Sequence, residues 1–194
     1  MRVDIHQELD PGDPQLEMPW EDESGAGLCY VDIKARPELA PVLVECRNRP
    51  ALAQLLKAIN SPICRTAKCD VWETTDMAED EHCDFGLACK VGSYVDVILD
   101  EPKFNSRVEP QLLLAGLIAK GAESLRVQAQ LEICVRRCLF HPQRWGYYLT
   151  LFIHAYGATA DEAEEEWNRV CAWMAEAWPG IDREFRSAGV RLEP

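Results

Sequence analysis

Alternating apolar and polar residues mark the segments that we expect to be strands. The clearest is 145–157, WGYYLTLFIHAYG, in which every second residue from Leu149 to Ala155 is aliphatic. This period is typical of a strand whose two faces meet different surroundings. Four more segments are predicted to be strands on the same grounds: 29–33, 64–75, 84–91 and 94–99.

The two strands on either side of Glu79 are expected to pair as a hairpin. A turn centred there would set Val71 opposite Leu87 and gather apolar residues on one face. A three-residue loop that begins at Gly92 is predicted to separate the second of these strands from 94–99.

Two helices are predicted before residue 140. Pro50 suits the first position of a helix, and the Asn-Ser-Pro that begins at Asn60 ends it. The segment 109–139, rich in Leu, Ala and Glu, is predicted to be helical throughout its length, with Gly116 and Gly121 as points where it could bend or divide.

The C-terminal helix has the strongest local signals. Thr159 is expected to be its N-cap, and Glu162 completes a capping box. Acidic residues fill the first turns, where the helix dipole favours them. We expect Pro179 and Gly180 to end this helix, and the segment 181–188 to pack beside it as a separate short piece.

These elements predict an α+β fold: a single sheet of about five mixed or antiparallel strands, with helices mainly on one face, loosely like a ferredoxin-like sandwich. Residues 28–194 are expected to form one domain. Residues 1–27 are rich in Pro, Gly, Asp and Glu, and we expect an acidic, flexible leader there.

Net charge narrows the range of partners. The chain carries a formal charge of −13 at pH 7, with 33 acidic side chains against 20 Lys and Arg. A nucleic-acid backbone requires clustered Lys and Arg, so nucleic acid is not expected as a partner. The sequence contains no apolar run of membrane-spanning length and no secretory signal, so we expect a cytoplasmic protein that binds no membrane.

The nine cysteines do not predict a metal or a redox centre. Cys64 and Cys69 are five residues apart and would lie on opposite faces of a regular strand, and Cys83 and Cys89 are too far apart for a zinc knuckle. No Cys-x-x-Cys occurs, and no phosphate loop or nucleophile elbow is present. We therefore expect buried thiols, no metal and no cofactor.

The polar face of the predicted sheet is unusually aromatic, and we expect it to bind. Exposed aromatic patches with polar rims mark binding or self-association surfaces. The alternative is that another segment covers this face and makes it core. The residues expected on it are Lys68, Asp70, Trp72, Tyr148, Phe152, His154 and Tyr156.

Two functions follow from this face. The first is an interaction domain that forms a homodimer or serves a partner protein, since two-fold dimers are the commonest oligomers. The second is a small-molecule enzyme in which His154 is the acid/base and Asp70 or Asp96 orients it, because histidine titrates near neutral pH. Binding is preferred to catalysis, since the sequence alone does not place either aspartate beside the histidine.

Overall fold

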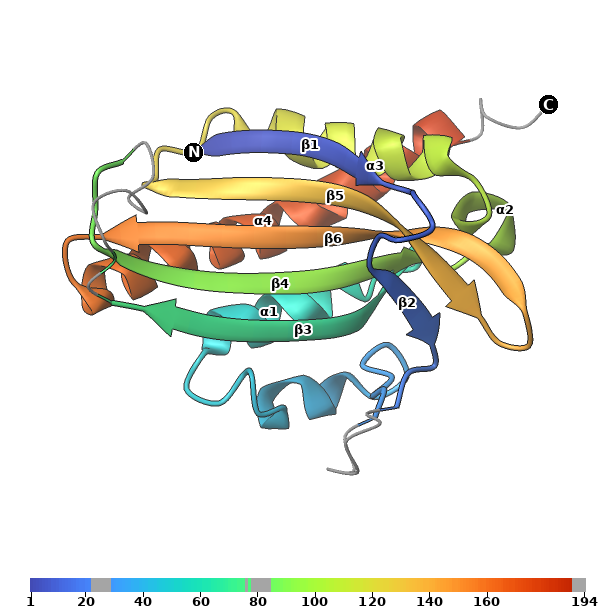
Figure 1. Ribbon diagram of the computed structural model, residues 1–194, viewed down its shortest axis with the longest axis horizontal. Helices are drawn as coiled ribbons and strands as arrows, with labels where there is room; N and C mark the ends of the chain where they lie inside the picture. Colours follow the sequence, from blue (N-terminus) through green and yellow to red (C-terminus); the bar gives the residue numbers. More distant parts are fainter. Residues whose placement is uncertain (22–28, 76, 78–84, 190–194) are drawn as a thin grey trace.

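The computed structural model describes residues 1–21, 29–75, 77 and 85–189. Pairs of consecutive strands alternate with helices, and the strands form one mixed sheet of six (Figure 1). In order, the elements are β1 (Arg2–Glu8), β2 (Gln15–Met18), the 3-10 helix η1 (Pro37–Val42), α1 (Pro50–Ile59), β3 (Cys64–Thr74), β4 (Cys89–Leu99), α2 (Pro102–Asn105), α3 (Val108–Ala122), β5 (Ala129–Phe140), β6 (Arg144–Gly157) and α4 (Ala160–Gly189).

The strand order is β1-β5-β6-β4-β3, and β2 extends the sheet beside the end of β5. β1 and β2 are both parallel to β5, and the other neighbouring pairs are antiparallel. An α+β fold with one mixed sheet is therefore confirmed. The likeness to a ferredoxin-like sandwich stays a prediction.

Helices α1, α3 and α4 lie against one face of the sheet (Figure 1). Alternate residues of the central strands, such as Val95, Leu151 and Ile133, are fully buried there with Trp167 of α4. The Trp167 indole N–H donates a hydrogen bond of 2.8 Å to the Ser93 hydroxyl, which ties α4 to β4. We call the opposite side of the sheet the open face.

Several sequence predictions are confirmed. α1 begins at Pro50 and ends before Asn60, and β6 occupies the predicted segment. Thr159 caps α4 as predicted, since its hydroxyl accepts from the Glu162 N–H at 3.2 Å. The Glu162 carboxylate accepts in return from the Ala158 N–H at 2.8 Å, one residue before the N-cap.

The prediction of an N-terminal leader is wrong for residues 2–8 and 15–18, which are strands of the sheet. Acidic residues are tolerated there because β1 is an edge strand. Its side chains alternate between the helix-covered side and the open face, where Asp4 and Glu8 pair with side chains of β5. The predicted strand at 29–33 is also wrong, since only an isolated bridge between Glu21 and Cys29 occurs there.

The end of the predicted strand 84–91 and all of 94–99 belong to one continuous strand, β4, and Gly92 is not in a turn. Residues 85–88 are not in a strand. The part of the predicted turn at 78–84 lies outside the described residues. Val71 pairs with Ser93 instead of Leu87, so the register differs from the prediction by six residues. The connection between β3 and β4 is longer than the predicted turn, and this shifts which residues pair. The alternation of apolar and polar residues alone is compatible with either register.

The long helix predicted over 109–139 divides into α3 and β5. Leu131, Ile133 and Val135 alternate with polar residues in β5, and this period-two pattern outweighs the local helix propensity. α4 does not end at Pro179 but continues to Gly189. Beyond the proline, Ile181 and Phe185 extend the buried stripe, and their burial offsets the lost backbone hydrogen bond.

Of the helices in the part of the chain that the structure describes, none combines the length and the apolar character that crossing a membrane requires.

Candidate functional site

Other segments of the chain cover the two ends of the open face. At one end β2 packs over the sheet and buries Tyr148 in a second apolar cluster with Leu16 and Met18. At the other end Phe85 lies against Tyr156, with ring centroids 5.4 Å apart. Tyr148 and Tyr156 are 4% and 6% exposed, so these two predicted face residues are not available to a partner.

An aromatic band remains half-buried in the middle of the open face. The His154 ring stacks on Phe152 at a centroid distance of 6.2 Å and meets the Trp72 indole edge-on at 5.9 Å. The Arg136 guanidinium lies over the other side of this band, 5.1 Å from the Phe152 ring. The structure therefore brings together three of the aromatic residues that the sequence predicted for this face.

Gly92 leaves room for the Trp72 indole in this band. Gly92 pairs with Trp72 on one side and with His154 on the other, and a Cβ built on it would overlap the indole ring. An aromatic side chain that covers a strand glycine replaces the packing that the glycine lacks.

His154 is held neutral. Burial is the larger cause and the Lys90 charge the smaller one that together lower its pKa to about 4. Its Nδ1 is buried and has no hydrogen-bond partner among the described residues. A base with so low a pKa is a poor match for proton transfer at neutral pH.

Neither predicted aspartate is positioned to orient His154. Asp96 pairs with Thr150, four residues along β6 from the histidine, which is roughly 13 Å at the rise of a strand. Asp70 lies on β3, where it pairs with Tyr94 of β4. Two strand spacings, about 10 Å, therefore separate it from β6. The three side chains thus do not form the arrangement that the enzyme alternative requires.

A polar network replaces that arrangement. Asp96 is buried and accepts a hydrogen bond of 2.7 Å from the Thr150 hydroxyl, which lies 3.4 Å from Nη1 of Arg136. Arg136 in turn binds Glu8 of β1 through Nε and Nη2, at 2.7 and 2.6 Å. Burial raises the pKa of Asp96 to about 7, and the Thr150 hydrogen bond opposes this only in part.

A cleft of about 900 Å³ lies along the edge of β3. Lys68 and Asp70, both predicted to belong to the binding face, lie in its wall with exposed side chains. This volume is within the range of small-molecule and peptide sites. The residues that line the cleft come from β2 and its continuation (Gln15, Leu16, Glu17, Trp20, Glu21), from the following segment (Cys29, Val31, Ile33), from the end of η1 (Val42, Leu43, Val44, Glu45), from α1 (Leu56), from β3 (Thr66, Ala67, Lys68, Cys69, Asp70) and from β4 (Tyr94).

A smaller hollow of about 480 Å³ lies between Met1, the segment 126–128 and the first turns of α4. Two of its three carboxylates already have partners: Glu162 caps its own helix, and Glu166 binds Arg169 and the Gln128 N–H. Few of its polar groups are therefore left for a ligand to bind.

The described cysteines are thiols, and most are buried. Burial raises the pKa of Cys64 and Cys69, and that of Cys46 to about 12, so these thiols are protonated and inert at neutral pH. Cys83, considered with Cys89 as a zinc ligand from the sequence, lies outside the described residues.

One group of side chains was not found from the sequence. His6, Glu8 and Cys134 converge on the open face where β1 and β5 pair. The alternation in RVDIHQE, residues 2–8, is a period-two signal that could have predicted the strand. The pairing of residue 6 with residue 134 has no signal in the sequence.

Comparisons with protein-family models, with curated proteins and with solved structures found no match for this chain. The functional interpretation therefore depends on the chemistry of these sites.

Proposed function

We propose that this protein is an interaction domain that binds an extended, basic and apolar segment of a partner protein in the cleft along β3. The observation that supports this most is the position of a 900 Å³ cleft beside a strand at the edge of the sheet. An edge strand offers unpaired backbone groups to a peptide that adds as a further strand.

The edge of β3 has the features of a strand that is partly protected. The ladder to β4 shifts register between Thr66 and Cys69, and the carbonyl group of Ala67 accepts a 2.8 Å hydrogen bond from the Trp20 indole. Beyond this irregularity the Val71 N–H donates to the adjacent Asp70 carboxylate at 2.8 Å, a local bond that a peptide carbonyl group can replace.

Apolar side chains across the cleft provide pockets for a partner. Val42 and Val44 are 70% and 60% exposed, two of the four large hydrophobic side chains exposed in the described part of the chain. Ile33 and Leu56 form a buried apolar floor between them and β3. In strand addition, such pockets select alternate side chains of the bound segment.

The charge of the cleft favours a basic partner. Four carboxylates line it, those of Glu17, Glu21, Glu45 and Asp70, against the single ammonium group of Lys68. The Lys68 ammonium lies 5.1 Å from the Trp20 ring centre, an interaction that stabilises it where it is. Complementary charge accelerates association and excludes acidic competitors.

The experiment compares synthetic peptides of equal length that alternate valine with lysine or valine with glutamate, by isothermal titration calorimetry. We expect the lysine peptide to bind and the glutamate peptide not to bind. Proline at alternate positions should abolish binding, because it removes the N–H groups that pair with β3.

Glu45→Lys should weaken binding of the lysine peptide about tenfold, the effect of roughly 1.4 kcal/mol. Glu38→Lys is the matched control, since Glu38 is exposed on η1 outside the cleft and the change of net charge is the same. Equal binding of both peptides, or equal loss in both variants, would show that the cleft does not recognise a basic strand.

The homodimer stays a prediction. Light scattering during the same titrations measures the mass of the free protein and reveals whether a second copy competes for the β3 edge.

A further inference from the structure

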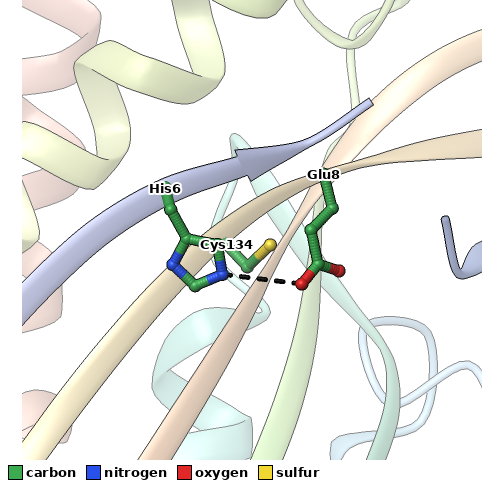
Figure 2. Close-up of side chains that lie close together, drawn as sticks. All are labelled: His6, Glu8 and Cys134. Carbon is green, nitrogen blue, oxygen red and sulfur yellow. Dashed lines mark ion pairs between the residues drawn. The ribbon is translucent and has the colours of Figure 1, made fainter. Parts of the chain in front are cut away.

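A second site lies at the opposite edge of the sheet, separate from the cleft that carries the proposed function. We propose that His6, Glu8 and Cys134 bind a zinc ion. Figure 2 shows the three side chains projecting from neighbouring strands into a common space, with an ion-pair contact between the histidine and the glutamate. Their ligand atoms all lie within 4.8 Å of one another.

The pairing of β1 with β5 creates this arrangement. His6 and Cys134 are directly paired neighbours in the parallel ladder, and Glu8 follows two residues later on the same face of β1. Tetrahedral zinc with ordinary bond lengths holds its ligand atoms roughly 3.4–3.6 Å apart. The His6 Nε2 and Glu8 Oε1 atoms are already 3.7 Å apart, so binding requires a side-chain movement of only about 1 Å.

Arg136 orients the carboxylate for this role. Its guanidinium binds Oε2 of Glu8 through two nitrogens, at 2.7 and 2.6 Å, and leaves Oε1 directed toward His6. Partners of this kind, which hold a ligand from behind, are a regular feature of protein metal sites.

The charges around the site suit a divalent cation. Glu132 contributes another carboxylate, with Oε1 3.3 Å from Nε2 of His6, close enough to approach an ion bound there. With Cys134 as the thiolate, two carboxylates and one thiolate surround the ion and Arg136 supplies one positive charge, so Zn²⁺ brings the total to zero. Sulfur, imidazole and carboxylate donors together favour zinc over magnesium or calcium.

Three protein ligands leave zinc an open position, which water or Glu132 can occupy. The ion can enter from solvent, because the His6 and Glu8 side chains are 36% and 31% exposed while Cys134 is fully buried beneath them. That burial argues against the other chemistry of a cysteine beside a histidine, since a nucleophile must be accessible to its substrate.

The test uses the full-length protein, freed of metal by a chelator and titrated with Co²⁺ as a spectroscopic substitute for zinc. We expect one Co²⁺ per chain, with the intense visible bands of tetrahedral cobalt and a thiolate-to-cobalt charge-transfer band in the near ultraviolet. Added Zn²⁺ should displace the cobalt and bleach both.

Cys134→Ser should abolish the charge-transfer band, and His6→Gln and Glu8→Gln should each weaken Co²⁺ binding at least tenfold. Cys138→Ser is the control, because Cys138 is also buried on β5 and lies outside the cluster. It should leave the spectrum unchanged. If Cys134→Ser does not fold, the two β1 variants carry the test, since their side chains are partly exposed. A spectrum that survives all three ligand variants, or protein that takes up no Co²⁺, would overturn the site.

Discussion

Gly92 is the residue on which the aromatic band depends. The Trp72 indole occupies the space where a side chain at position 92 would begin. Gly92→Ala should therefore destabilise the protein by about 1–3 kcal/mol, the usual cost of overpacking. Urea unfolding measures this change.

The matched control for this substitution is Gly116→Ala in α3, where a Cβ meets nothing within 4 Å and helix propensity improves. That variant should be neutral or more stable by up to about 1 kcal/mol. Adding Trp72→Leu to Gly92→Ala should recover part of the loss. A loss that does not depend on residue 72 would contradict the proposed overlap.

Asp96 and His154 make stability depend on pH in opposite directions. Burial raises the pKa of Asp96 from 3.8 to about 7, so the native state holds its proton more tightly and stability is lost as pH rises from about 4 to 7. Burial lowers the pKa of His154 from 6.5 to about 4, so stability is lost as pH falls from about 6.5 to 4.

Asp96→Asn removes the first effect and keeps an oxygen for the Thr150 hydrogen bond. The variant should be more stable than the parent at pH 8, by an amount on the order of 1–3 kcal/mol, and similar to it near pH 4. Asp70→Asn, an exposed carboxylate on the same face, should change stability by less than about 0.5 kcal/mol. Chemical denaturation at pH 4, 6 and 8 tests this, and a difference that does not vary with pH would rule it out.

At the scale of elements, α4 shows how packing outweighs a local breaker. Pro179 lies inside the helix and supplies no N–H for the carbonyl group of the residue four positions earlier. The helix continues because Trp178, Ile181 and Phe185 are all buried.

Pro179→Ala should restore the missing hydrogen bond and stabilise the protein by about 1–3 kcal/mol. Pro50→Ala provides the comparison, because Pro50 is at the first position of α1, where its missing N–H costs nothing. Thermal unfolding should show a higher Tm for the first variant and no gain for the second. A lower Tm for Pro179→Ala would mean that the helix does not run through this position.

At the scale of the whole molecule, the N-terminal strand determines what each edge of the sheet can do. β1 pairs with β5 and becomes the strand at that edge, while β3 lies at the other edge, where residues of β2 contribute to the lining of the 900 Å³ cleft. The same pairing brings His6 beside Cys134, although 127 residues separate them in the chain. Both proposed sites thus arise from how the N-terminal segment folds onto the sheet.

The sequence by itself determined the elements whose signals are local. The alternation in 145–157, the proline at residue 50 and the capping pair of Thr159 and Glu162 each lie within one element, and each was predicted correctly. Periodicity identifies such segments because side-chain direction repeats within a single helix or strand.

Tertiary structure alone decided which segments meet. The register of β3 with β4 and the pairing of β1 with β5 depend on contacts between distant residues. The alternation within a strand specifies neither its partner nor its register. For the same reason the sequence predicted Tyr148 and Tyr156 for a binding face, although Leu16, Met18 and Phe85 pack against them. The period-two alternation of a strand determines which face each side chain occupies, but only the folded chain determines what covers that face.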